Sequence, residues 1–234
     1  RPLYRFMNRN EPLFNTEGPA PGSDLDQTGR QSTTGKIPHT VNLNARIMTE
    51  TDSAQPHELA GSGELLLGAG DFAIGGYANA TLNAERHISS EQTGQLNVAA
   101  ELTLDAPLLT AGAGVRTTID AGEHGVTITD SGASSDEAGE LGGTLLIKGS
   151  EINHGGNIRV RSGQVELQAR AAGGDVTLRS NSVIDVSGIS RKFDEITVDT
   201  WGGKVTLHAD DGNVVAQNGS VINVEGADAG NGDD

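Results

Sequence analysis

From residue 61 onward, short apolar segments alternate with polar residues at the period of a β-strand. In the segment VTL, Val176 and Leu178 face one side of an extended chain and Thr177 faces the other. Gly, Asn, Asp and Ser fill the gaps between segments, as turns require. Pro is absent after Pro107, and no stretch carries the apolar stripe of an amphipathic helix. The pattern predicts an all-β protein built from many short strands.

One stretch of this pattern, the repeated phrase, occurs twice in the sequence. Its first copy is residues 163–188, which align with the second copy, residues 203–226. The matched aliphatic pairs are Val165/Val205, Leu167/Leu207, Ala169/Ala209, Val176/Val214, Ile184/Ile222 and Val186/Val224. The offset between matched residues becomes slightly smaller along the phrase, because the second copy has a shorter turn after Ala209. Each copy holds three short strands, and the segment 190–203 intervenes between the copies.

Three strands in each copy describe one coil of a parallel β-helix. A single coil cannot bury its inward side chains, so coils stack and equivalent residues form ladders. We expect the matched Val, Leu and Ile pairs to be inward ladders, and the corner Gly residues to supply positive φ. Asp185 and Asn223 are predicted to point outward, with a polar ladder at a corner as the alternative. An antiparallel β-sandwich is the alternative architecture, but it does not predict the matched phrases.

Pro and Gly divide the chain into two regions. Five of the seven Pro lie at or before Pro38, whereas most of the 33 Gly follow residue 60. Residues 1–60 are therefore predicted to be an extended, Pro-rich N-terminal segment, in which residues 1–40 form an extended or disordered strap. Residues 61–234 are predicted to be the β-helix repeat domain.

The repeated phrases GGDVTL and GGKVTL, with SVIDVSG and SVINVEG, resemble the filamentous haemagglutinin-like exoproteins of bacterial two-partner secretion. The resemblance covers residues 61–234 and is strongest over 142–226. It implies a right-handed parallel β-helix (a solenoid), secretion through an outer-membrane transporter, and a role in cell adhesion or biofilm formation. The NPNG- and NPNL-like motifs of the family's N-terminal secretion domain are absent. We therefore expect this chain to be an internal or C-terminal segment of a longer exoprotein, or a diverged relative of the family.

Charge narrows the range of partners. The chain carries 16 Lys and Arg against 32 Asp and Glu, a net charge of −16. Phosphate recognition needs clustered Lys and Arg, so we expect neither a nucleic acid partner nor binding to an anionic membrane surface. No apolar run reaches the roughly 18 residues of a membrane-spanning helix, so we expect no membrane insertion.

The sequence matches the residue patterns of known catalytic sites only weakly. Polysaccharide hydrolysis needs two carboxylates about 5 to 9.5 Å apart. Asp210 and Asp211 are adjacent, but the His-Gly elements at His124 and His154 precede them, whereas a pectin-hydrolase-like site has such an element after its Asp pair. We interpret Asp210 and Asp211 as a solvated turn and expect no catalytic residues. The six His lack metal-ligand spacing and the chain has no Cys, so we expect no zinc site.

Calcium is the one metal for which the sequence offers candidate ligands. The candidate ligands gather in a single Gly- and Ser-rich stretch: Asp130, Asp136, Glu137 and Glu140. Hard oxygen ligands suit Ca²⁺, but no EF-hand pattern is present. We favour acidic loops that serve solubility, and expect no cofactor.

The segment 190–203 holds two aromatic residues, Phe193 and Trp201, the second of which is the single Trp of the chain. An aromatic ring on a loop beside a sheet can stack on a sugar, which makes these two residues the candidate ligand-binding positions. The alternative, which we favour, is that they cover the flank of the solenoid as a small satellite core.

These observations predict a non-enzymatic module of a secreted or cell-surface bacterial adhesin. Loops on a rigid stalk would contact a glycan, a host or matrix surface, or other segments of the same exoprotein. Two alternatives stay open: a β-helical polysaccharide-degrading enzyme, and a purely structural scaffold in a larger extracellular assembly.

Overall fold

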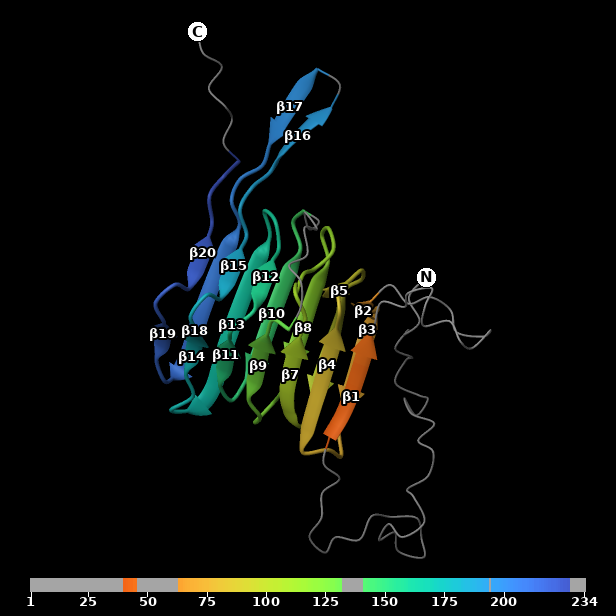
Figure 1. Cartoon of the computed structure of the whole chain (residues 1–234), viewed down its shortest axis with the longest axis vertical. Coiled ribbons are helices and arrows are strands. Elements are labelled where there is room, and N and C mark those ends of the chain that lie inside the picture. Colours follow the sequence, from red (N-terminus) through yellow and green to blue (C-terminus); the bar gives the residue numbers. More distant parts are fainter. Residues whose placement is uncertain (1–39, 46–62, 132–140, 194, 228–234) are drawn as a thin grey trace, which may run out of the picture.

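The computed structural model describes residues 40–45, 63–131, 141–193 and 195–227. Parallel strands stack there as a β-solenoid of about five turns, and the described residues contain no helix. Figure 1 shows the strands side by side along the stack. The parallel β-helix that the sequence predicts is confirmed.

Successive turns of the chain build three parallel faces. The first face has seven strands, in the order β1 (Thr40–Ala45), β4 (Asn79–Ala84), β7 (Glu101–Asp105), β9 (Val126–Thr129), β11 (Ile152–His154), β14 (Val176–Leu178) and β19 (Val214–Ala216). The second face has six strands, in the order β3 (Gly70–Ile74), β6 (Gly94–Val98), β8 (Arg116–Asp120), β10 (Thr144–Gly149), β13 (Gln164–Ala172) and β18 (Lys204–Asp211).

The third face consists of two groups of strands joined by one residue. Its members are β2 (Glu64–Leu67), β5 (His87–Ser90), β12 (Asn157–Arg159), β15 (Val183–Asp185) and β20 (Val221–Asn223). Leu109 pairs with Ile88 of β5 and with Ile158 of β12, and so connects the groups. A separate antiparallel hairpin, β16 (Ser190–Phe193) and β17 (Ile196–Asp199), lies between β15 and β18 in the chain.

Apolar residues of successive turns form ladders inside the solenoid. The ladder of the second face is Phe72, Leu96, Ile119, Ile147, Leu167 and Leu207. The ladder of the third face is Leu65, Ile88, Leu109, Ile158, Ile184 and Ile222. All but the last member of each ladder are at most 4% exposed. Each such burial contributes about 1.5–3 kcal/mol, so these ladders are the core.

The register of the repeated phrase is the predicted one. The strand partners include Val165/Val205, Leu167/Leu207, Ala169/Ala209, Val176/Val214 and Ile184/Ile222. The earlier member of each pair is at most 1% exposed, which confirms its inward position.

Asp185 and Asn223 are also register partners, and Asp185 continues the row from Arg159. Asp185 is only 8% exposed, because Arg161 Nη1 lies 2.9 Å from Oδ2 and Ser187 Oγ donates to Oδ1 at 2.7 Å. The two residues thus belong to a polar ladder on a strand face, not at a corner.

The Gly residues that open the repeated phrase are needed for close packing. A Cβ at Gly203 would lie 2.0 Å from the carbonyl oxygen of Gly163, and one at Gly163 would lie 2.3 Å from that of Gly143. Neither Gly163 nor Gly203 has a positive φ, which corrects the expectation for these corners. Gly173 and Gly219 do have the expected positive φ, of 73° and 85°.

β1 lies inside the predicted N-terminal segment, residues 1–60, yet it pairs in parallel with β4 of the solenoid. Leu43 of β1 packs against the apolar core. Residues 1–39 and 46–60 lie outside the described residues, so the boundary between the two regions stays a prediction.

In the first face, the inward ladder of Leu43, Leu82, Leu104 and Ile128 is interrupted by His154. His154 lies between Ile128 and Leu178 in the register and is 0% exposed. Its Nε2 is 3.2 Å from the carbonyl oxygen of Val183 and donates to it, whereas Nδ1 has no hydrogen-bond partner among the described residues. Burial lowers the pKa of His154 from 6.5 to about 4, although the hydrogen bond to Val183 opposes the shift.

Acid should therefore destabilise the solenoid through His154. Between pH 6.5 and 4 the unfolded chain binds a proton that the folded chain does not, so stability is highest above pH 6.5 and falls on acidification, by about 3 kcal/mol from this residue. Urea denaturation of the wild type and of His154→Leu at pH 7 and pH 4.5 measures the difference. The variant should lose much of the pH dependence, and an equal dependence in both proteins would contradict this expectation.

Candidate functional site: a corner groove and a projecting hairpin

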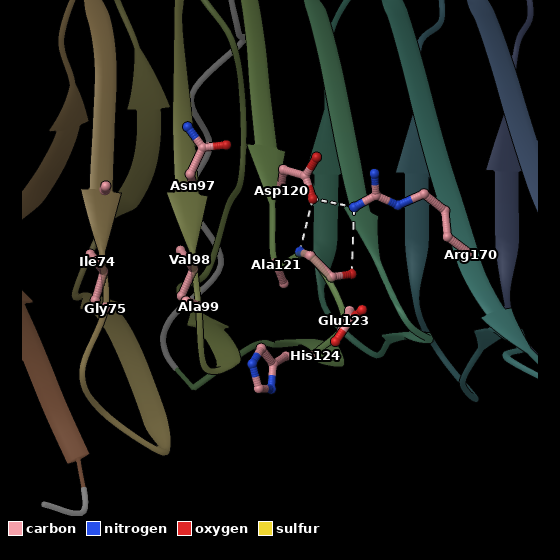
Figure 2. Close-up of a pocket in the computed structure, with 12 residues that line it drawn as sticks. Ile74, Gly75, Asn97, Val98, Ala99, Asp120, Ala121, Glu123, His124 and Arg170 are labelled. Carbon is pink, nitrogen blue, oxygen red and sulfur yellow. Dashed lines mark hydrogen bonds and ion pairs between the residues drawn. The ribbon is translucent and has the colours of Figure 1, made fainter.

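A groove of about 570 Å³ lies where the second face turns into the first. The ends of β3, β6 and β8, the turn before β9, and Arg170 of β13 line it (Figure 2). Its volume is in the range of small-molecule sites. Because it crosses three strands of one face, it extends about 10 Å across them.

Small residues keep the groove open. Gly75, Ala99 and Gly122 follow β3, β6 and β8 at equivalent places in three successive turns. A Cβ at Gly75 would lie 3.9 Å from the Cβ of Ala99, and Ala99 N donates to the carbonyl oxygen of Ile74 at 2.8 Å. Longer side chains at these three places would fill the groove.

One side of the groove carries an anchored ion pair. Arg170 donates through Nη2 to the carboxylate of Asp120, and the same nitrogen lies 3.5 Å from the carbonyl oxygen of Gly122 (Figure 2). Gly122 N also donates to Asp120 Oδ1 at 2.8 Å. Asn97, the register partner of Asp120, continues this polar row.

The turn Glu123–Gly125 supplies the other side. His124 Nδ1 lies 3.6 Å from Oε1 of Glu101, and Gly125 N donates to Oε2 of Glu101 at 2.9 Å. Glu101 thus holds the turn, and Glu123 is exposed. Amide, carboxylate, imidazole and guanidinium groups around an open floor can exchange hydrogen bonds with a hydroxyl-rich ligand, such as a stretch of glycan.

The sequence interpretation did not single out this groove. The sequence feature that could have revealed the groove is the regular spacing of Gly75, Ala99 and Gly122. These small residues recur at nearly equal intervals and follow equivalent strands. Arg170 carries no such signal, because it enters the groove at a break in register between Ala169 and Ala172.

The Asp pair considered from the sequence lies elsewhere. Asp210 and Asp211 end β18 and are exposed. Asp210 Oδ1 is 2.9 Å from His208 Nε2 and accepts from Gln168 Nε2 at 3.3 Å. Neither Asp lines the groove.

The calcium candidates are only partly described. Asp130 is exposed, and its Oδ2 accepts from Asn157 Nδ2 at 2.6 Å. Asp136, Glu137 and Glu140 lie outside the described residues. In the described part of the chain, no group of three or more His, Cys, Asp or Glu side chains could hold a metal ion, and the loop as a whole stays untested.

The hairpin β16–β17 projects from the solenoid along the strand direction, beyond the ends of the neighbouring strands (Figure 1). Its strands pair Arg191 with Val198 and Phe193 with Ile196. Ile196 is 68% and Val198 45% exposed, so these residues do not pack on the solenoid. The side chain of Phe193 lies outside the described part.

Trp201 stands at the base of this hairpin and is 89% exposed. It therefore does not cover the flank of the solenoid, contrary to the interpretation favoured from the sequence. Thr200, the residue before it, fixes the base, because its hydroxyl accepts from Ile189 N at 2.8 Å and its carbonyl accepts from Ala227 N at 2.9 Å. The structure thus presents an indole ring on a firmly held base.

Comparisons with family models, curated proteins and solved structures found no match to this chain. In the residues that the structure describes, no helix is long and apolar enough to span a membrane.

Proposed function

We propose that this chain is a non-enzymatic module of a secreted or cell-surface bacterial exoprotein, in which a stiff β-solenoid presents the hairpin β16–β17 to a glycan or to a host or matrix surface. The observation that carries the proposal is the 89% exposure of Trp201 at the base of that hairpin. The resemblance of the repeated phrases to filamentous haemagglutinin-like adhesins supports secretion by a two-partner pathway through an outer-membrane transporter.

The distribution of exposed apolar side chains favours the hairpin as the binding region. Among the described residues that precede the last turn, β18 to β20, the large apolar side chains that are exposed are Ile196, Val198 and Trp201, all in the hairpin or at its base. Apolar groups left in water on an otherwise well-packed protein mark interaction sites. The remainder of the solenoid then serves as a spacer that keeps these groups away from the cell.

Replacing Trp201 with Ala should weaken binding to immobilised glycans or to cells by about tenfold, because an exposed aromatic anchor supplies a large share of a contact. Binding to a glycan array and to cultured cells measures the effect. Trp201→Phe, which keeps an aromatic face, should retain part of the binding. Unchanged binding by Trp201→Ala would show that the hairpin base is not the binding site.

One observation favours a second candidate function, that of a polysaccharide-degrading enzyme. The groove places Asp120, Glu123 and His124 around one elongated space. Asp120 is held by Arg170, which leaves Glu123 as the exposed carboxylate that is able to exchange a proton with a bound sugar chain. If the chain is an enzyme, this groove is its active site.

An enzyme of this kind should release reducing ends from one member of a polysaccharide panel, and Glu123→Gln should lower the rate by about a hundredfold, as expected for loss of a general acid or base. Glu91→Gln, an exposed position outside the groove, is the matched control. Absence of product from every polysaccharide, or equal rates for the two variants, would reject the enzymatic candidate.

A further inference from the structure

The hairpin β16–β17 is a sheet of only two strands that projects beyond the solenoid (Figure 1). A two-stranded hairpin in water is marginally stable, because few of its side chains are removed from solvent. Ile196 and Val198 of β17 are 68% and 45% exposed. Each strand pairs only with the other, so each has one open edge of backbone N–H and C=O groups.

The two faces of the hairpin differ in polarity. Residues directly opposite each other in an antiparallel pair lie on the same face, so Val198 shares a face with Arg191. Thr197 and Lys192 share the other face for the same reason. Ile196 lies on the face of Val198, because strand side chains alternate. β17 thus has aliphatic side chains on one face and polar ones on the other, the pattern of a half-buried strand.

The two edges of the hairpin differ in charge. β16 carries Arg191 and Lys192, which are both exposed. Basic side chains on an edge strand, Lys above all, protect that edge against pairing with another chain. β17 contains no basic residue, whereas Glu195 precedes it and Asp199 ends it. The edge of β17 is therefore the one that is open to a further strand.

A second copy of the hairpin fits this edge poorly. If β17 pairs with itself about a two-fold axis at Thr197, Ile196 falls opposite Val198 of the second copy. Glu195 then falls opposite Asp199 twice, and like charges directly opposite each other are destabilising. A shift of one residue places Ile196 opposite Asp199, an aliphatic side chain against a carboxylate. Pairing β17 with β16 of another copy does not close, so it would continue as an open filament.

The strand that fits the edge of β17 alternates aliphatic and basic residues. Its aliphatic side chains would lie beside Ile196 and Val198 and remove them from water. Its basic side chains would lie opposite Glu195 and Asp199, where opposite charges are favourable. Asp199 is partly buried, and Ser190 Oγ donates a hydrogen bond to its Oδ1, so this carboxylate is held in place. The net charge of −16 also favours a basic partner over an acidic one.

We propose that the edge of β17 is a docking site for an extended peptide segment of alternating aliphatic and basic residues, which adds to the hairpin as a third strand. Main-chain hydrogen bonds supply the affinity of such strand addition, and the alternate side chains supply its specificity. The inference rests on the proposed role of the hairpin as the presented segment, and it names a polypeptide as the partner of β17. It does not depend on the ligand of Trp201.

The experiment uses two synthetic peptides and the isotope-labelled full chain. The first peptide has the central sequence Lys-Val-Thr-Val-Lys, flanked by Gly and Ser, and the second has Glu in place of both Lys. NMR titration measures the two dissociation constants. The Lys peptide should bind about tenfold or more tightly than the Glu peptide, because its charges complement those beside β17. On binding, backbone amides of β17 should become protected from hydrogen exchange.

Charge exchange on the protein tests the same register. Glu195→Lys should weaken binding of the Lys peptide by about tenfold and strengthen binding of the Glu peptide. Ile196→Thr, which keeps the β-branched shape but loses apolar surface, should weaken binding of both peptides. Lys192→Glu, on the protected edge of the same hairpin, is the matched control and should not weaken binding of the Lys peptide. Circular dichroism confirms that each variant is folded.

Trp201→Ala distinguishes this docking site from the glycan site proposed above. It should leave binding of the Lys peptide unchanged, and its effect on glycans and cells tests only the hairpin base. Absence of binding by the Lys peptide, or equal binding of both peptides, would overturn the docking site. So would a Glu195→Lys variant that binds the Lys peptide as the wild type does. Filaments or dimers that the wild type forms through β17 without peptide, detected by sedimentation, would overturn it as well, because a second copy would then occupy the edge.

Discussion

The structure depends on the stacking of inward aliphatic side chains between turns that have no core of their own. A turn such as β13 to β15 has only three strands, and each inward residue is covered by its equivalents above and below. Leu167 is 0% exposed for this reason, whereas Ile222, covered on one side alone, is 43% exposed. Stability in such a repeat is shared between nearest neighbours, which makes an end turn different in kind from an interior turn.

This constraint also determines where the chain is free to carry function. Interior positions must repeat, so variation is confined to corners, insertions and ends. The groove lies at a corner, and the hairpin β16–β17 is an insertion between two matched turns.

The repeating part of the structure could be predicted from the sequence, and the exceptions could not. Matching residues 163–188 to 203–226 yields the correct register, since stacking forces equivalent residues to be alike. His154 was not predicted to be inward, because only its ladder neighbours, Ile128 and Leu178, reveal the place it occupies. The exposure of Trp201 and the reach of Arg170 arise from an insertion and a break in register, neither of which has a repeated counterpart to compare. The assignment to secreted adhesins stays a proposal.

Equivalent residues of successive repeats stack directly on one another within one chain, and the rest of the structure follows from this stacking. Glu166 and Thr206 are register partners in β13 and β18, and the native chain has no Cys. A chain with Glu166→Cys and Thr206→Cys should form an intramolecular disulfide on mild oxidation, because neighbouring parallel strands are about 4.8 Å apart, within the reach of the bond. Glu166→Cys with Asp210→Cys, which places the second Cys well out of register on the same strand, should not form it. Equal cross-linking in both chains, or none in the first, would contradict the stacked solenoid.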